Sequence, residues 1–276
     1  MSRYIDTLPT PRHIKPKKLI VLSAPRTGTL GLYLALQQLG FKPYHMKEVL
    51  ERGPKELQIV IDGFKAESFH DGRPYGREDF DKWLADYDVI IEMPFLMLRS
   101  ILKAYPDAKF LLTERDPEKW AQSCLNTMGV AYTQFNRLPM SVFKYFDSFT
   151  RTMDKMFGLG MRYLTSSEGY SEQGREMMVK NYKSYIAEVK RLVPPEQLKI
   201  CRLEDGFGWN EICPYLGVPI PDTPWPQLHT ADEFHTIVKP MVVDAVWKAM
   251  ASLTTMVAFA AVGLWYAKEG LVPSRA

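Results

Sequence analysis

The sequence predicts an α/β fold in which helices cover both faces of a parallel sheet, giving three layers. Short apolar runs of strand length, such as KLIVL at 18–22 and DVIIE at 88–92, alternate with helical patterns. Continuous apolar runs of this kind are typical of strands buried on both faces of a parallel sheet. The connections are short, which is the second feature of doubly wound folds.

The 276 residues are expected to divide into three segments. Residues 1–17 carry three prolines and are expected to form a loose N-terminal arm. Residues 18–240 are long enough to bury a full core, and we expect them to form one domain. A hydrophobic helix over residues 246–268 is expected to follow.

The first half of the domain is expected to alternate strands and helices. The helix after the first strand stops at Gly40, a residue type favoured just past a helix end. The expected elements are, in order, a strand at 18–22, a helix ending at Gly40, a short strand at 42–45, a helix from about Met46 to Gly53-Pro54, a loop at 68–80 and a strand at 88–92.

The second half is expected to combine the remaining strands with a helical insertion. Pro117 fits the first position of a helix, where its missing N–H is not needed. The expected elements are, in order, a helix through 96–105, a strand at 109–113, a helix from Pro117, a mostly helical stretch at 118–193, a strand at 198–203 and a Pro-rich segment at 214–226 that lies against the domain.

The turn between the first strand and the first helix has the features of an anion-binding loop. Backbone N–H groups at a helix N-terminus, helped by the helix dipole, favour negative charge at the carboxyl end of a strand. A glycine permits close approach, hydroxyls can donate, and an arginine adds a charged fork. The candidate residues are Pro25, Arg26, Thr27, Gly28, Thr29, Leu30 and Gly31. The alternative is a tight turn that only packs the helix on the sheet.

Two well-known nucleotide motifs are absent from this turn. It contains neither Gly-x-x-x-x-Gly-Lys-Ser/Thr nor Gly-x-Gly-x-x-Gly. A phosphotransferase or nucleoside triphosphatase therefore stays an alternative. The chain lacks the lysine at the helix start and the magnesium-binding carboxylate that such an enzyme would need.

A second candidate anion site lies in KFLLTERDPEKWAQSC. Arg115 comes just after a predicted strand, and Ser123 follows eight residues later in the next helix. Both side chains are expected to grip one phosphate beside the first loop. The alternative for Arg115 is a surface salt bridge, which contributes little to stability.

The two motifs together resemble the sulfotransferase superfamily, and the resemblance covers about residues 18–240. The segment 208–234 is similar to one fungal and eukaryotic branch of P-loop sulfotransferase-like proteins. The resemblance implies a P-loop-type sheet and 3′-phosphoadenosine 5′-phosphosulfate as co-substrate, with the first loop on the phosphosulfate and Arg115 and Ser123 on the 3′-phosphate. The chain departs from the cytosolic sulfotransferases by carrying Arg26 in place of a lysine and by lacking their late Arg-Lys-Gly segment.

The resemblance implies sulfuryl transfer to a hydroxyl or amine, with Arg26 neutralising charge on the leaving oxygen. Two residues are candidates for the base. Glu92 ends the strand at 88–92, two residues before a proline, where cytosolic members carry a histidine and other members a glutamate. His45 closes the short second strand and has a side chain suited to proton transfer. The alternatives are a salt bridge from Glu92 to an arginine and a packing role for His45.

The acceptor is expected to be a small apolar molecule, because residues 118–165 are rich in methionine and aromatic side chains. No histidine or cysteine spacing suggests a metal site, and no metal is expected. A different class of function also remains open, a catalytically inactive, membrane-tethered binding module. The oligomeric state is left open.

Charge and cysteine usage limit the partners and the compartment. A net charge of +3 without dense basic runs does not favour a nucleic-acid partner. Cys124, Cys201 and Cys213 form no Cys-x-x-Cys pair and are expected to be buried free thiols in a reducing compartment. The N-terminus has no apolar core of a secretory signal.

The C-terminal region predicts a membrane anchor. Residues 249–267 contain no charged residue and would span about 28 Å as a helix, close to the thickness of a bilayer core. Lysines and interfacial aromatics bracket the stretch: Lys248, Lys268, Trp247, Trp265 and Tyr266. We expect a tail anchor with the domain on the cytoplasmic face, and otherwise a cytoplasmic protein. The alternative is a buried or dimer-forming terminal helix.

Overall fold

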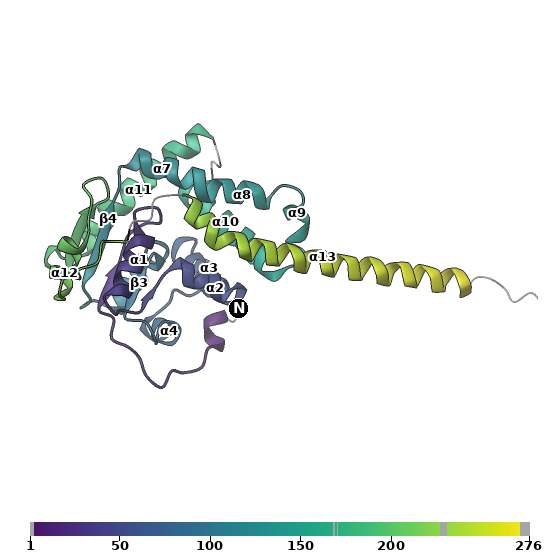
Figure 1. Cartoon of the computed structure of the whole chain (residues 1–276), viewed down its shortest axis with the longest axis horizontal. Helices are drawn as coiled ribbons and strands as arrows, with labels where there is room; N and C mark the ends of the chain where they lie inside the picture. The colour runs from purple at the N-terminus through teal and green to yellow at the C-terminus, as the bar shows by residue number, and fades with distance from the viewer. Residues whose placement is uncertain (1–2, 168, 170, 227–230, 271–276) are drawn as a thin grey trace, which may run out of the picture.

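Five parallel strands form one sheet in the order β2-β3-β1-β4-β5 (Figure 1). The computed structural model describes residues 3–167, 169, 171–226 and 231–270, without the side chains of 231–242, 245, 249, 269 and 270. The strands are β1 (Leu19–Val21), β2 (Pro43–Tyr44), β3 (Val89–Ile91), β4 (Phe110–Glu114) and β5 (Leu198–Arg202). All five lie where the sequence predicts strands, and the parallel sheet is confirmed.

Helices cover both faces of the sheet, which confirms three layers. In β1, Leu19 and Val21 point to one face and pack on α1 (Thr29–Gln38) and α12 (Trp209–Leu216). Ile20 and Leu22 point to the other face and join the larger core. This two-sided burial is the reason for the unbroken apolar run, because neither face of the strand meets water.

The larger core is closed by helices from the first half of the chain and from the helical insertion. The former are α2 (Met46–Arg52), α3 (Pro54–Ser68), α4 (Arg77–Trp83), α5 (Met93–Leu96) and α6 (Leu98–Ala104). Sequence analysis did not predict α3, although Pro54 opens it and its apolar residues recur at helical spacing. The loop expected at 68–80 is shorter, because α4 begins at Arg77. The single helix expected at 96–105 is interrupted at Met97, whose backbone leaves the helical region.

The helical insertion predicted at 118–193 is confirmed. It contains α7 (Pro117–Cys124), a π-helical turn η2 (Leu125–Gly129), α8 (Val130–Phe135), α9 (Met140–Phe143), α10 (Ser148–Thr165) and α11 (Glu172–Leu192). Asp116 caps α7 and Asp147 caps α10, each by accepting a backbone N–H from the first turn. The three cysteines are buried free thiols, as predicted.

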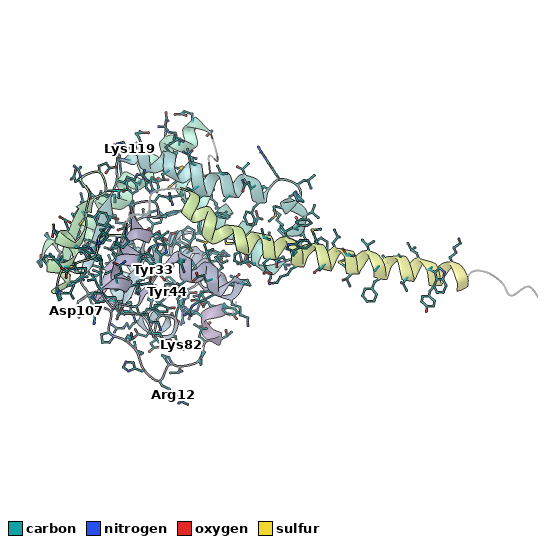
Figure 2. The ribbon with its side chains drawn as sticks, in the orientation of Figure 1. Arg12, Tyr33, Tyr44, Lys82, Asp107 and Lys119 are labelled. Atoms are coloured by element: carbon teal, nitrogen blue, oxygen red, sulfur yellow. The ribbon has the colours of Figure 1, made fainter. Side chains whose placement is uncertain are left out.

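The last helix, α13 (Ala231–Gly270), begins against α9, α10 and η2 and then leaves the domain (Figure 1). Its stretch Val246–Lys268 has a mean hydropathy of 1.5 and the length to cross a membrane, and none of it is buried. The later part of α13 extends away from the domain (Figure 2), and its apolar side chains Phe259, Leu264 and Tyr266 are exposed. The alternative of a helix buried in the domain is therefore wrong.

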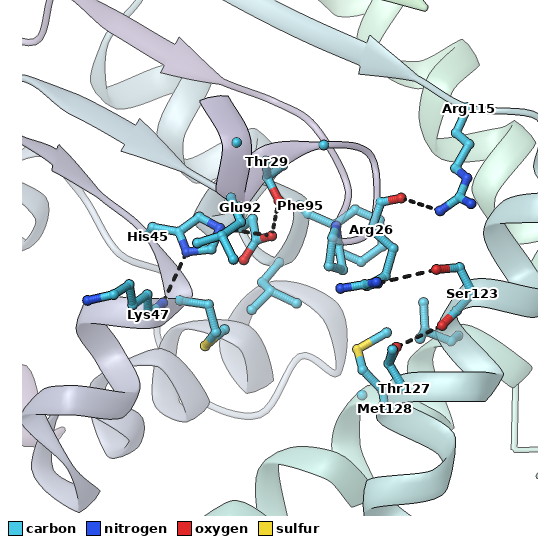
Figure 3. A pocket seen from close by; sticks show the side chains of 18 of the residues that line it. Arg26, Thr29, His45, Lys47, Glu92, Phe95, Arg115, Ser123, Thr127 and Met128 are labelled. Carbon is cyan, nitrogen blue, oxygen red and sulfur yellow. Dashed lines mark hydrogen bonds and ion pairs between the residues drawn. The ribbon is translucent and has the colours of Figure 1, made fainter. Parts of the chain in front are cut away.

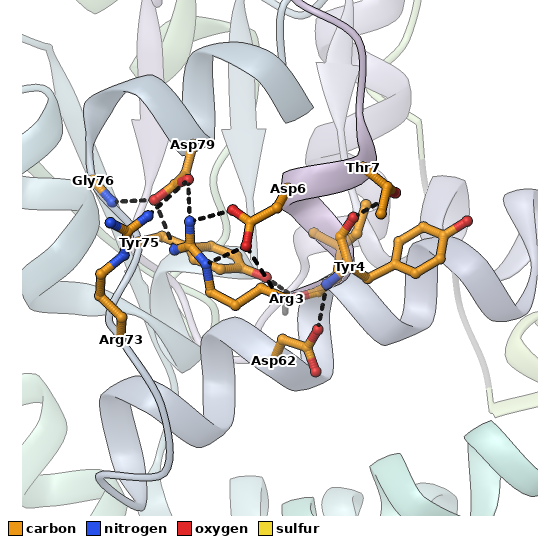
Figure 4. A network of polar contacts seen from close by, with 10 residues as sticks. Arg3, Tyr4, Asp6, Thr7, Asp62, Arg73, Tyr75, Gly76 and Asp79 are labelled. Carbon is orange, nitrogen blue, oxygen red and sulfur yellow. Dashed lines mark hydrogen bonds and ion pairs between the residues drawn. The ribbon is translucent and has the colours of Figure 1, made fainter. Parts of the chain in front are cut away.

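The N-terminal arm is not loose over its first residues. A short helical turn, η1 (Tyr4–Thr7), packs on α3 and α4 with Ile5 fully buried. Arg3 donates two hydrogen bonds to Asp79, of 2.9 and 2.8 Å, and the Tyr4 N–H donates to Asp62 (Figure 4). A bidentate pair of this kind is strong, because both oxygens of the carboxylate are engaged. The arm is thus part of the domain.

Arg3→Ala is expected to lower the free energy of unfolding by about 2 kcal/mol, because Asp79 loses its charge partner in a half-buried position. Urea unfolding measures this change. Arg73→Ala is the matched control, since Arg73 lies 4.0 Å from the same carboxylate but is 73% exposed. Equal effects of the two substitutions would contradict the proposed role of the Arg3 pair.

Candidate functional site

The candidate site lies where the carboxyl ends of the five strands meet. A cavity of about 1010 Å³ is lined by residues that follow every strand of the sheet. They include the loop 25–31 after β1 except Thr27, His45 after β2, Glu92 after β3, Arg115 after β4 and Phe207 after β5. Ligands of open parallel sheets bind at this edge, next to the point where the strand order reverses.

The N-terminus of α1 faces this cavity without a capping side chain. Its first-turn N–H groups, at Thr29, Leu30 and Gly31, belong to residues that line the cavity. Gly28 precedes them with φ at 87°, the left-handed region that favours glycine. A Cβ at this position would meet Leu203 at 3.0 Å and Phe207 at 3.3 Å. The loop therefore suits an anion of phosphate type, and glycine is required where it turns.

The sequence predicts that both hydroxyls of the loop are available to an anion, but only one of them faces the cavity. Thr27 is fully buried, and its Oγ1 donates to the Ala24 carbonyl at 2.7 Å and contacts Thr113 Oγ1 at 2.9 Å. Its hydroxyl thus holds the loop on β4, and that expectation is wrong for Thr27. Thr29 Oγ1 does line the cavity but donates to Glu92 at 2.5 Å.

The two predicted anion motifs come together on one side of the cavity (Figure 3). Arg26 donates from Nε to Ser123 Oγ at 3.3 Å, and Arg115 donates from Nη1 to the Arg26 carbonyl at 2.8 Å. Lys119, one turn before Ser123, also lines the cavity and was not singled out from the sequence. This side of the cavity gathers cationic and hydroxyl groups, which suits a second phosphate.

An aromatic pair positions both motifs and was missed from the sequence. Trp120 stacks on Tyr182 with ring centroids 4.3 Å apart. The Trp120 indole N–H donates to the Pro25 carbonyl at 2.8 Å, and the Arg115 N–H donates to the Tyr182 hydroxyl at 3.0 Å. The sequence carries one signal for this pair. Trp120 comes three residues after Pro117, which opens the helix, and at that spacing its side chain points inward.

Glu92, His45 and Thr29 form a cluster on the other side of the cavity. His45 Nε2 lies 3.2 Å from Glu92 Oε1 and has no aligned hydrogen-bond partner among the described residues. His45 Nδ1 accepts the Lys47 N–H at 3.1 Å, so the neutral ring carries its hydrogen on Nε2. Both base candidates from the sequence are thus neighbours. Glu92 makes its close polar contacts to Thr29 and His45, and no arginine salt bridge to it occurs among the described residues.

The environment of Glu92 favours its charged form. Burial alone raises the pKa of this carboxyl, but the nearby His45 ring, Thr29 hydroxyl and Arg26 guanidinium outweigh burial and hold the pKa below its ordinary value of 4.5. Glu92 also has φ at 67°, which is strained for a residue with a side chain. Such strain is common where a catalytic group must point into a cavity.

The remaining wall of the cavity is apolar. From η2 and α10 it takes Met128, Met153, Met156, Phe157, Met161 and Leu164, and beside the loop it takes Phe207 and Trp225. The part of this wall from η2 and α10 lies in the region 118–165, from which an apolar acceptor was expected. No three metal-ligating side chains gather in the described part of the chain.

The depressed pKa of Glu92 predicts a pH-dependent contribution to stability. A carboxyl whose folded pKa is lowered stabilises the fold above its unfolded pKa, and this contribution is lost as pH falls through the folded pKa. The difference in unfolding free energy between the natural protein and Glu92→Gln should be constant above about pH 5 and shrink below it. Urea unfolding over that range tests this, with the exposed Glu196→Gln as control. A difference that widens in acid would contradict it.

Comparison with known proteins gives a matching family model and a curated relative. A family model described as "Sulfotransferase domain" matches residues 18–234. The "Ava biosynthesis cluster protein M" of Aspergillus versicolor is 27% identical over 267 residues, covering 93% of this chain and 99% of that protein.

Two solved structures are similar at 16% identity. The match to a sulfotransferase from Alicyclobacillus acidocaldarius has a TM-score of 0.40 and covers 86% of this chain and 96% of the other chain. The match to the sulfotransferase domain from the curacin biosynthetic pathway has a TM-score of 0.37 and covers 79% of this chain and 80% of the other chain. Since the family model spans most of the chain, from the first strand to the start of α13, the chain belongs to the sulfotransferase domain family.

Proposed function

We propose that the protein transfers a sulfuryl group from 3′-phosphoadenosine 5′-phosphosulfate to a hydroxyl or amine of a small apolar acceptor. The observation that carries this proposal is the division of one cavity into a cationic side, an acidic side and an apolar wall. Sulfuryl transfer needs these three features: cations at the leaving phosphate, a base at the acceptor, and a pocket that orients it.

The co-substrate fits the donors of the cationic side. The uncapped N–H groups of α1 suit the phosphosulfate, and Arg26 suits the oxygen that leaves the sulfur. Arg115, Ser123 and Lys119 suit the 3′-phosphate. In the bond exchange, an acceptor oxygen forms a bond to sulfur while the bond from sulfur to the bridging oxygen breaks. Adenosine 3′,5′-bisphosphate is the leaving product.

Glu92 is the proton acceptor in this proposal, and His45 is its positioning partner. Because His45 Nδ1 accepts a backbone N–H, its other nitrogen carries a hydrogen and has no lone pair for the acceptor proton. Glu92 Oε1 takes hydrogen bonds or ionic contacts from Thr29 and His45, which leaves Oε2 for the substrate. Its charged form is the one that its surroundings favour.

We also propose that α13 anchors the protein in a membrane, with the domain on the cytoplasmic face. The stretch Val246–Lys268 is exposed and apolar, and as a helix it is about 34 Å long. Trp247 and Tyr266 near its ends suit the two membrane interfaces. Buried free thiols agree with the reducing cytoplasm.

Calorimetric titration of the full chain in detergent with adenosine 3′,5′-bisphosphate tests the nucleotide site. Arg115→Ala should raise the dissociation constant about 10- to 100-fold, because a charged hydrogen bond to phosphate is lost. Arg12→Ala, an exposed arginine outside the cavity, is the control. Failure of the natural protein to bind, or tighter binding of ATP with magnesium, would reject the proposal.

Glu92→Gln should lower kcat by about 100- to 10,000-fold while leaving bisphosphate binding unchanged, because it removes the base and keeps the shape. Transfer of radiolabelled sulfuryl groups to a panel of apolar phenols and alcohols measures this. His45→Gln should have the smaller effect. Preference for charged sugars would contradict the apolar acceptor, and nucleotide binding without any transfer would favour a binding module.

A further inference from the structure

Apolar side chains are exposed on the corner of the domain formed by α9 and its flanking residues. Leu138 is 79% exposed, Val142 39% and Tyr145 70%. We call these three residues the α9 face. They lie within eight positions of one another in the sequence, whereas exposed large apolar residues elsewhere in the described part of the domain are scattered. A cluster of this kind marks an interaction surface more often than chance exposure does.

The α9 face lies beside the start of the proposed membrane span. Helix α13 packs against α9 before it leaves the domain, and α9 lies alongside the point of departure (Figure 1). The span begins at Val246, in the same helix. If residue 246 lies at the membrane surface, the α9 face therefore lies at that surface too.

The charges around the α9 face suit anionic lipid headgroups. Arg137 is exposed next to Leu138. The two acidic residues of the neighbouring segment are neutralised or covered, since Asp154 pairs with Lys144 at 2.9 Å and Asp147 is buried. Aromatic and aliphatic side chains beside a cation are the composition of membrane-surface segments.

We propose that the α9 face docks on the lipid bilayer and holds the domain against it, beyond simple tethering by α13. This inference rests on the proposed membrane anchor. Lipid is the partner because the α9 face is continuous with a span of bilayer length, and because the apolar side chains of the face are bordered by a cation. The interfacial Tyr145 would lie at headgroup depth.

Docking has a consequence for the cavity. Helix α13 packs on α10 and η2, which carry the methionines and the phenylalanine of the apolar cavity wall. A docked domain therefore keeps that wall next to the membrane surface. The acceptor class that fits this arrangement is a hydroxyl-bearing molecule that partitions into lipid.

Nitroxide depth measurements on the full chain in lipid nanodiscs test the docking. Single cysteines replace Leu138, Ile220 and Ala258, and the three natural thiols are buried and stay unlabelled. Ile220 is the matched control, because it is exposed and apolar and follows α12 by four residues. Helix α12 lies at the far end of the domain from α9 (Figure 1). Collision rates with oxygen report lipid, and those with a neutral nickel chelate report water.

The label at Ala258 should be in lipid, and the label at Leu138 should collide with the nickel chelate several-fold less than the label at Ile220. Adding phosphatidylserine to phosphatidylcholine should lower the rate at Leu138 further, since Arg137 lies beside it. A lipid-exposed label at Ala258 with a fully aqueous label at Leu138 would overturn docking but keep the anchor. Aqueous labels at both positions would overturn both. Neither result bears on the proposed sulfotransferase activity, which the bisphosphate titration and the transfer assay test separately.

A label at Leu138 also perturbs the face that it reports on, so a second variant is needed. Leu138→Glu combined with Tyr145→Glu should make a label at Val142 several-fold more accessible to the nickel chelate. Ile220→Glu should leave that accessibility unchanged. Equal accessibility at Val142 in the double variant and in the parent would overturn the proposal.

Discussion

The site depends on three hydrogen bonds that side chains donate to the carbonyls of one short loop. Thr27 holds the carbonyl of Ala24, Trp120 that of Pro25, and Arg115 that of Arg26. Because a peptide carbonyl and the N–H that follows it point in opposite directions, fixing the last two carbonyls turns the next two N–H groups the other way. The three bonds thereby fix the backbone of residues 24–26, directly before the uncapped N-terminus of α1. Two of the three donors come from the segment after β4, which ties the two anion motifs to one geometry.

The same arrangement separates charge across the cavity. Arg26 extends from the loop toward the side that also holds Arg115 and Ser123, while Glu92 turns toward Thr29 and His45 (Figure 3). Thr29 is shared between the two sides: its backbone begins α1, and its hydroxyl donates to the Glu92 carboxylate. One cavity thus holds both cations that can stabilise a developing negative charge and a carboxylate that can accept a proton.

Much of the fold could be predicted from the sequence, because burial on both faces of a parallel strand leaves an unbroken apolar run that is easily detected. The strands at 18–22 and 109–113 are of this kind. The loop could be predicted from its glycine and hydroxyl residues between a strand and a helix, and the C-terminal helix from its length without charge. Contacts between distant segments could not be predicted. Nothing local to Thr27 shows that its hydroxyl faces Thr113, and nothing near Trp120 shows that its indole reaches Pro25. The preference for Glu92 over His45 as the proposed base also depends on the backbone N–H of Lys47. Only the folded chain places this N–H against the His45 ring.

Glu92 and Arg26 both hold φ near +67°, where a residue with a side chain is strained by about 1–3 kcal/mol. Glycine at either position would relax the backbone and delete the functional group in the same step. For this chain, relief of backbone strain at either position would therefore come with the loss of side-chain contacts in the cavity, since Arg26 bonds to Ser123 and Glu92 to Thr29. Backbone strain and side-chain contacts act in opposite directions on stability at these two positions.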